Sequence, residues 1–344
     1  MIEKQLQRKE NKDNTFNFAL SPLRIVFMGT PEFAVASLDA LIKAGYNIVG
    51  VITAPDKPSG RGMQLQQSAV KKYAVEHHLH VLQPEKLKNP EFLEALRLLH
   101  ADLQIVVAFR MLPEAVWNMP PMGSVNLHGS LLPQYRGAAP INWAVINGEK
   151  ETGVTTFKLK HEIDTGDILL QESFPIGDND TAGDVHDTMK EIGAQLLVKT
   201  VKGLAEGSLV EREQTTMDGR QTTDNSGQSS IHRPSSLKHA PKIFTETCRI
   251  DFSKTVDEVH NLIRGLSPFP GAFTMLNGKT LKIYTSEKIF DKRQTVDNRD
   301  DAYQTDGKTF LKFACADGYI AVKELQLEGK KKMNVEDFLR GYRF

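Results

Sequence analysis

The chain has 344 residues, of which 40% are hydrophobic and 25% charged, with 43 basic and 43 acidic side chains. This composition is that of an ordinary globular protein of about two domains, and it excludes collagen-like, coiled-coil and wholly disordered chains. No window approaches the ~18 consecutive apolar residues of a membrane span, and the polar tail 1–22 lacks the apolar core of a signal peptide. The two cysteines, Cys248 and Cys315, form neither a disulfide framework nor a metal site by themselves. We therefore expect a cytoplasmic protein without a membrane partner.

Short apolar runs alternate with helical patterns through the first two hundred residues. Leu23–Met28 predicts a buried strand, and Thr30 and Pro31 then predict an N-cap followed by proline in the first helical position. Further strands are expected at 48–53, 81–83, 103–108, 124–127 and 154–159, and helices at 31–44, 68–77, 89–100 and 181–205. This alternation predicts an α/β domain over 23–206, with a Rossmann-like, doubly wound and mainly parallel sheet.

The second half begins with a polar stretch, 207–235, that has almost no apolar periodicity, so we expect a linker there. Beyond it, short strands are expected at 248–252, 272–276, 279–284, 311–314 and 319–327, around one helix at 256–263. Asn277–Gly278 and Asp317–Gly318 are hairpin signals. Residues 236–344 are therefore expected to form a small β-barrel. They carry 19 Lys and Arg against 15 Asp and Glu, which favours an anionic partner or is a chance imbalance of the surface.

The segment Ser124–Pro140 is the strongest candidate site. Asn126 and His128 are two residues apart at a strand end, so their side chains share one face, and open α/β sheets bind ligands beyond such ends. An amide and an imidazole can both donate to a developing oxyanion, and the imidazole can also move a proton. The alternative is that both side chains only satisfy loop backbone groups. A dinucleotide site is not expected, because the first βα turn holds Gly29 alone of the three glycines required.

Two further segments carry polar chemistry. HEIDTGD, residues 161–167, places Asp164 in a glycine-containing loop, where a carboxylate can orient a histidine or only close an Asx turn. The long loop 54–67 holds Lys57 and Arg61 against a single acid, Asp56, which suits contact with phosphate but also an ordinary solvated loop. No His, Cys or Glu spacing resembles a zinc site.

The motifs themselves resemble those of a known family. NLHGSLLPQYRGAAP at 126–140, followed by DTGD at 164–167, resembles the signature of formyltransferases that use 10-formyltetrahydrofolate. GTPEFA at 29–34, PDKPSGRG at 55–62 and the C-terminal extension make the chain similar to the methionyl-tRNA formyltransferase family within that group. The resemblance extends from about Leu23 to the C-terminus.

This resemblance implies roles for particular residues. The catalytic side chains would be those of Asn126, His128 and Asp164. The folate-binding residues would be Ser130, Leu131, Leu132 and Pro133. The loop 54–67 would reach the tRNA acceptor stem through Arg61, and 236–344 would be an OB-like tRNA-binding domain. The nearby Lys57 and the run Lys330, Lys331 and Lys332 add positive charge that suits a phosphate backbone.

The implied reaction moves a formyl group from 10-formyltetrahydrofolate, a co-substrate, to the α-amino group of methionine on initiator tRNA. We expect Asn126 and a protonated or donor-form His128 to stabilise the tetrahedral oxyanion. We expect Asp164 to orient His128 and to help remove the ammonium proton through water, and the protein to be a monomer that needs no metal. Other formyl-folate enzymes remain as alternatives: those acting on a nucleotide sugar or glycinamide ribotide, or a hydrolase of formyl-folate. A non-catalytic RNA-binding protein is a further alternative, against which the intact triplet argues.

Overall fold

The computed structural model describes residues 23–59, 64–214, 237–291 and 303–343. The predicted N-terminal tail and most of the predicted linker lie outside these residues, as does Arg61. The chain divides into two compact units, one formed by residues up to 125 with 198–209 and the other by 126–197 with 210 onward. Among the described helices, none combines the length and the apolar sequence that a membrane crossing requires.

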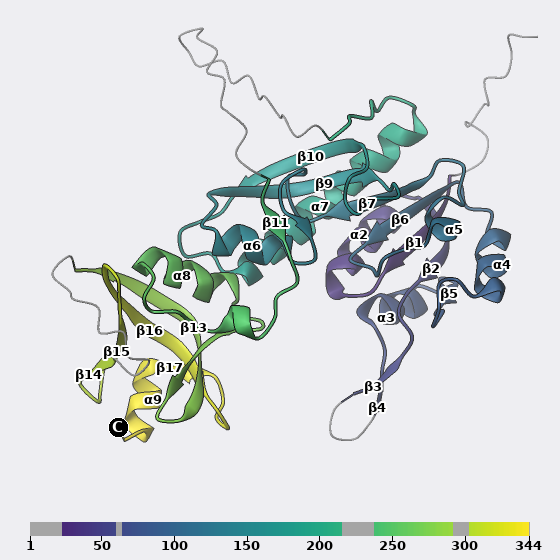
Figure 1. Cartoon of the computed structure of the whole chain (residues 1–344). Helices are drawn as coiled ribbons and strands as arrows, with labels where there is room; N and C mark the ends of the chain where they lie inside the picture. Colours follow the sequence, from purple (N-terminus) through teal and green to yellow (C-terminus); the bar gives the residue numbers. More distant parts are fainter. Residues whose placement is uncertain (1–22, 60–63, 215–236, 292–302, 344) are drawn as a thin grey trace, which may run out of the picture. The chain divides into compact units, whose positions relative to one another are not determined.

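The first unit is built on parallel strands with helices between them (Figure 1). Strand β1 pairs in parallel with β2 on one side and with β6 on the other, and β2 pairs with β5. The strands are β1 (Arg24–Gly29), β2 (Asn47–Ile52), β5 (Val81–Leu82) and β6 (Leu103–Val107). The helices are α2 (Glu32–Lys43), α3 (Ala69–Glu76), α4 (Pro90–Leu98) and α5 (Glu114–Trp117). The predicted alternation of strands and helices is confirmed, whereas α5 was not predicted.

The predicted start of helix α2 is wrong by one residue. Pro31, not Thr30, is the N-cap residue, with an extended backbone (φ −78°, ψ 174°) and no hydrogen bond from a described side chain to cap the helix. The reason is that the carbonyl of Pro31 already accepts a helical hydrogen bond, from the Ala34 N–H at 3.0 Å. Helix α4 begins as predicted, with the Asn89 side chain accepting from the N–H of Glu91.

The long loop after β2 contains an unpredicted two-stranded ribbon. Its strands are β3 (Lys57–Ser59) and β4 (Gln64–Gln66). At the base of the ribbon, the Asp56 carboxylate accepts hydrogen bonds from Lys71 Nζ at 2.5 Å and Gln83 Nε2 at 2.8 Å. The one acid of this loop is therefore paired with Lys71, while the Lys57 side chain is exposed.

Three further strands complete the sheet: β7 (Ser124–His128), β9 (Glu151–Lys158) and β10 (Ile168–Pro175). The helices of this part are α6 (Pro140–Ile146) and α7 (Ala182–Ala205). The sheet has the order β10-β9-β7-β6-β1-β2-β5, and β10 pairs antiparallel with β9. The predicted mainly parallel, Rossmann-like fold is thus confirmed, with an antiparallel edge strand that the sequence pattern did not reveal. The hairpin of β9 and β10 carries the 161–167 loop at its turn.

The C-terminal residues form a curled antiparallel half-barrel with two helices against it (Figure 1). The strand order is β12-β13-β16-β15-β14, and β17 pairs with β16. The strands are β12 (Ala272–Leu276), β13 (Lys279–Phe290), β14 (Tyr303–Thr305), β15 (Leu311–Cys315), β16 (Gly318–Leu327) and β17 (Met333–Asn334). The helices are α8 (Val256–Gly265) and α9 (Val335–Gly341). Both predicted hairpins, β12–β13 and β15–β16, are confirmed.

The predicted strand at 248–252 is wrong. Glu246–Cys248 is a short 3₁₀ helix, and the Asp251 carboxylate accepts hydrogen bonds from the N–H and hydroxyl of Ser253, which closes a turn. Only one bridge to the sheet forms here, between Arg249 and Phe273. The apolar residues of this segment pack into the core of the half-barrel, but the segment does not add a strand to the sheet.

Helix α8 packs against helix α6 at a glycine. A Cβ on Gly265 would lie 2.5 Å from the side chain of Ile146 and 2.9 Å from its backbone nitrogen, so a larger residue would force the helices apart. The Asn142 side chain donates to the carbonyl of Gly265 at 2.8 Å.

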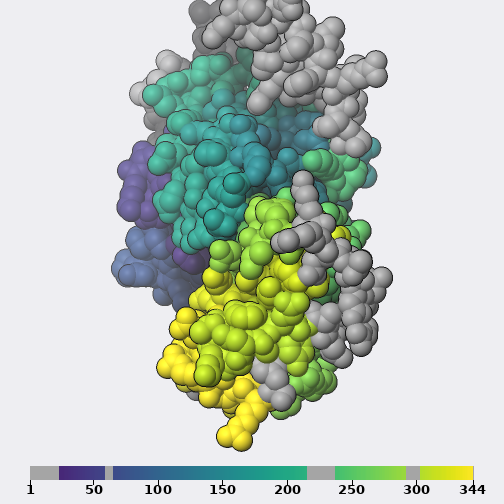
Figure 2. All heavy atoms as spheres, turned by 90° about the vertical axis from the view of Figure 1, so that its left-hand side faces the viewer, coloured from purple at the N-terminus to yellow at the C-terminus, as the bar shows by residue number. Residues whose placement is uncertain are grey.

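Two buried basic side chains of α8 extend this contact. Arg264 donates to the carbonyls of Gly177 and Asp180, at 3.3 and 2.9 Å, just before helix α7. His260 Nδ1 hydrogen-bonds the Ser286 hydroxyl at 2.9 Å, and burial lowers its pKa. The bond to Ser286 lies within the half-barrel. The Arg264 bonds, together with His260 Nε2 at 3.4 Å from the carbonyl of Asp178, attach the half-barrel to the segment that follows β10, within the second unit. Figure 2 shows the surface that the residues after 237 form, in green to yellow.

Candidate active site

Strand β7 presents two polar side chains at its carboxyl end. Leu127 between them is buried in the core, and alternation along the strand puts Asn126 and His128 on the other face, as predicted. The Asn126 amide is half-buried and has no hydrogen-bond partner among the described residues. It is therefore free to donate to a bound molecule.

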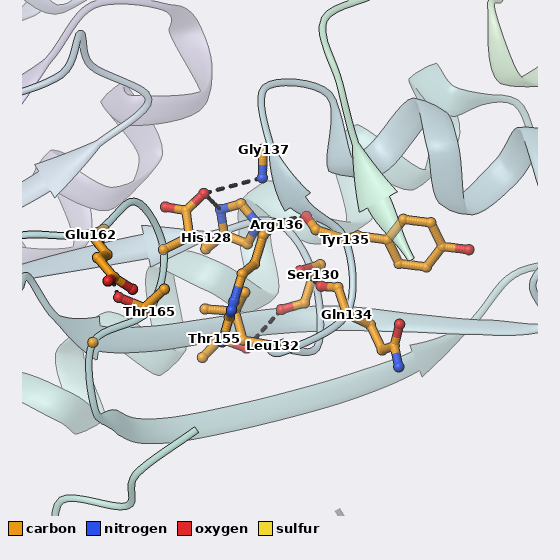
Figure 3. A network of polar contacts seen from close by, with 12 residues as sticks. His128, Ser130, Leu132, Gln134, Tyr135, Arg136, Gly137, Thr155, Glu162 and Thr165 are labelled. Atoms are coloured by element: carbon orange, nitrogen blue, oxygen red, sulfur yellow. Dashed lines mark hydrogen bonds and ion pairs between the residues drawn. The ribbon is translucent and has the colours of Figure 1, made fainter. Parts of the chain in front are cut away.

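The tautomer of His128 follows from its hydrogen bond. Nε2 lies 3.0 Å from the backbone oxygen of Tyr135, and a carbonyl oxygen only accepts, so Nε2 carries the proton. The neutral ring then has its lone pair on Nδ1, which lies 3.9 Å from Oδ2 of Asp164 (Figure 3). The neutral ring accepts a proton at this atom, and only the charged ring donates from it. The form of His128 that donates from Nδ1 is therefore the protonated ring, and the role of His128 in the reaction stays a prediction.

Asp164 is held by a residue distant in sequence. Its Oδ2 accepts from the N–H of Gly137 at 3.1 Å, and its backbone lies in the left-handed region (φ 54°). Gly166 in the same loop is required, because a Cβ there would lie 1.5 Å from the carbonyl oxygen of Lys158. The carboxylate thus bonds across to the loop after β7 and does not only close a local turn, while its catalytic role stays a prediction.

The loop after His128 is fixed by a hydrogen bond within itself and by others to strands β9 and β10. The Ser130 hydroxyl donates to the carbonyl of Gln134 at 2.7 Å. Thr155 Oγ1 donates to the Ser130 carbonyl and accepts from the Leu132 N–H, at 2.7 and 3.1 Å. Gln171 Nε2 donates to the Leu132 carbonyl at 2.9 Å. Figure 3 shows Ser130, Leu132 and Thr155 in this arrangement.

These bonds bear on the four predicted folate-binding residues. Ser130 and Leu132 are buried, whereas Leu131 and Pro133 are half-buried. The structure therefore gives Ser130 and Leu132 a role in shaping the loop, and leaves parts of Leu131 and Pro133 accessible. Their contact with folate stays a prediction.

Tyr135 belongs to the site although sequence reasoning missed it. Its backbone is left-handed (φ 59°), its ring is buried, and its hydroxyl donates to the Glu149 carboxylate. Burial raises the pKa of Tyr135, and the hydrogen bond to Glu149 raises it further. Lys238 closes the cluster, with Nζ 2.5 Å from Glu149 and its carbonyl 2.7 Å from the N–H of Tyr135. The carbonyl that fixes His128 is thus fixed in turn by the chain beyond the linker.

The described residues among the predicted tRNA contacts belong to different elements. Lys57 is exposed on β3, Lys330 and Lys331 are exposed in the turn after β16, and Arg61 lies outside the described residues. Lys332 Nζ is 2.8 Å from Oε2 of Glu324. Among the described residues, no group of His, Cys, Asp or Glu is arranged to hold a metal ion.

At the carboxyl end of β7, an amide donor and an imidazole thus share one face, and a carboxylate lies 3.9 Å from the imidazole. This arrangement suits transfer of an acyl-type group. Residues 23–201 match the formyl transferase domain, and residues 242–343 match the formyl transferase C-terminal domain. The chain belongs to the formyl transferase family.

Its relatives include the methionyl-tRNA formyltransferase of Phocaeicola vulgatus, which is 56% identical over 327 residues, covering 93% of this chain and 96% of the relative. The methionyl-tRNA formyltransferase of Bacteroides fragilis is 52% identical over 327 residues, with 93% and 95% covered. A sugar 3N-formyl transferase solved with dTDP and 5-N-formyl-THF superposes with a TM-score of 0.60 over 90% of this chain and all of that chain. At 22% identity it shows the shared fold.

Proposed function

We propose that this protein transfers a formyl group from 10-formyltetrahydrofolate to the α-amino group of methionine on initiator tRNA, giving N-formylmethionyl-tRNA. The observation that carries the proposal is the geometry of His128, with Nε2–H held by the Tyr135 carbonyl and Nδ1 facing Asp164. The choice of acceptor is supported by relatives named methionyl-tRNA formyltransferase. Their sequences are more than half identical to this chain over nearly their whole length.

The three side chains divide the chemistry between them. Attack of the neutral amine on the formyl carbon forms a C–N bond and places negative charge on the formyl oxygen. Asn126 donates its amide N–H to that oxygen. His128 accepts the proton of the amine at Nδ1, and the Asp164 carboxylate stabilises the resulting imidazolium. When the bond from carbon to N10 breaks, the imidazolium returns the proton to N10, and tetrahydrofolate leaves.

The loop from Ser130 to Pro133 is the proposed wall of the folate site. Its backbone is held on Thr155 and Gln171, so the positions of its accessible groups do not depend on ligand. This rigidity suits a site that must present the formyl carbon to Asn126 and His128, because a misplacement of ~1 Å costs about 10² in rate.

For the tRNA, we propose contacts by Arg61, Lys57, Lys330, Lys331 and Lys332. Aromatic rings paired with lysines on the half-barrel support a nucleic-acid partner. Lys312 Nζ lies 3.9 Å from the centre of the Tyr319 ring and 5.7 Å from that of Phe310, and Lys288 Nζ lies 5.9 Å from that of Phe290. Phe310 and Phe290 are exposed, whereas Tyr319 is buried. The two exposed phenylalanine rings beside lysines allow both stacking on bases and attraction to phosphates.

The proposal includes a cytoplasmic, monomeric enzyme without a resident metal. It is tested by measuring formyl transfer to methionyl initiator tRNA, to glycinamide ribotide and to a nucleotide-linked amino sugar. Transfer to the charged tRNA alone supports the proposal, and transfer only to a small amine would replace it with one of the other formyl-folate activities.

A further inference from the structure

Gln214, the last described residue in the first part of the linker, uses the whole of its side-chain amide between two loops of the site. Nε2 donates to the backbone oxygens of Asp164 at 3.0 Å and Gly166 at 2.7 Å. Oε1 accepts from Nε and Nη2 of Arg136, at 3.1 and 2.6 Å. Two donors and two lone pairs are thus all satisfied, which is the whole hydrogen-bonding capacity of a glutamine side chain.

These four hydrogen bonds hold the residues on both sides of the hydrogen bond between the Gly137 N–H and the Asp164 carboxylate. Arg136 directly precedes Gly137, whose N–H donates to Asp164 Oδ2. Gln214 therefore holds the donor side of that bond through Arg136 and the acceptor side through the backbone of Asp164. The left-handed backbone of Asp164 needs such support, because a non-glycine residue is strained there.

The backbone ahead of Gln214 is itself anchored. The N–H of Ile168 donates to the carbonyl of Arg212 at 2.7 Å, and the N–H of Arg212 donates to the carbonyl of Ile168 at 2.9 Å. This bridge lies at the start of β10, where the 161–167 loop ends. The start of the linker is thus paired with the hairpin that carries Asp164, and Gln214 is placed without depending on a bound ligand.

We propose that Gln214 is a positioning residue, which sets the distance from the Asp164 carboxylate to His128 Nδ1 by tying the Asp164 loop to Arg136. The inference rests on the proposed function for the reaction that is measured. It assigns the first part of the linker to the active site rather than to a passive connection between domains.

The test is the substitution Gln214→Glu. Glutamate keeps the size of the side chain and a partner for Arg136, but it replaces the two N–H donors by oxygen facing the carbonyls of Asp164 and Gly166. We expect kcat for formyl transfer to fall by about 10- to 100-fold, with KM for both substrates within about threefold of the parent value, because the loop shifts while the binding surfaces remain. Gln214→Ala should show the same split between kcat and KM.

The control is Glu213→Gln, which changes the charge by one unit in the opposite direction at the adjacent, exposed position and keeps the size of the side chain. It should keep the parent kinetics. Melting temperature is measured for all three variants, so that a loss of fold is separated from a loss of position. Parent-like kcat in Gln214→Glu would overturn the inference, as would a loss confined to KM. Failure of the parent enzyme to formylate charged tRNA would instead overturn the proposed function.

Discussion

Replacing Asp164 by Asn separates the charge of this side chain from its shape. An Asn carbonyl oxygen can still accept from the N–H of Gly137, which holds the loop in the parent at 3.1 Å. What is lost is the negative charge 3.9 Å from His128 Nδ1. The side chains of His128 and Asp164 are only 8% and 13% exposed, so solvent screens their interaction weakly.

The size of the effect follows from that distance. At an effective dielectric constant of about 20, two unit charges about 4 Å apart interact with ~4 kcal/mol. Because the imidazolium exists only after the amine proton has moved, this energy is missing from the transition state and not from the ground state. We expect kcat to fall by about 10³, with the affinity for substrates little changed.

Single-turnover formylation at saturating substrate measures this loss, and a thermal melt of the same variant shows whether the fold persists. A kcat within tenfold of the parent would refute the charge argument. A melting temperature that collapses together with the activity would instead favour a structural turn.

Three further predictions concern the donor, the tRNA contacts and the half-barrel. Asn126→Ala should lower kcat by about 10²–10³ with folate affinity retained, and turnover within tenfold of the parent would exclude its oxyanion role. Arg61→Ala should lower kcat/KM for charged tRNA by about 10² without changing folate binding, whereas neutralising Lys330–Lys332 should weaken tRNA binding and flatten its salt dependence by about one unit per lost contact. Because burial lowers the pKa of His260, its unfolded form binds protons first, so stability should fall as pH drops below about 6.5. Denaturant unfolding of the parent and of His260→Gln between pH 7 and 5 checks this, and equal slopes would contradict it.

Local patterns were sufficient to predict most of the fold. The strands and helices that were predicted for the first unit differ from their predicted bounds by a few residues, because buried apolar runs and proline or glycine ends are local features. The short helix α5 and the ribbon of β3 and β4 were not predicted. The edge strand β10 was missed since ILLQESFP lacks a clear alternation. The strand expected at 248–252 failed because its apolar residues bury themselves around a turn.

Local sequence features also predicted one part of the site, the shared face of Asn126 and His128. These two residues are two positions apart on a strand, and that spacing alone places their side chains on one face. The contacts that fix the site join residues far apart: Gly137 with Asp164, and Lys238 with Tyr135. No local periodicity indicates such pairs, and a backbone carbonyl that orients a histidine has no signature in the sequence.

The central claim is tested most directly by formylation of methionyl initiator tRNA by the purified parent protein with 10-formyltetrahydrofolate, with the product identified after release of the amino acid. We expect N-formylmethionine at a rate that Asn126→Ala and Asp164→Asn each lower by at least about 10², and no comparable transfer to glycinamide ribotide. Absence of N-formylmethionine, together with rapid formylation of a small amine, would contradict it.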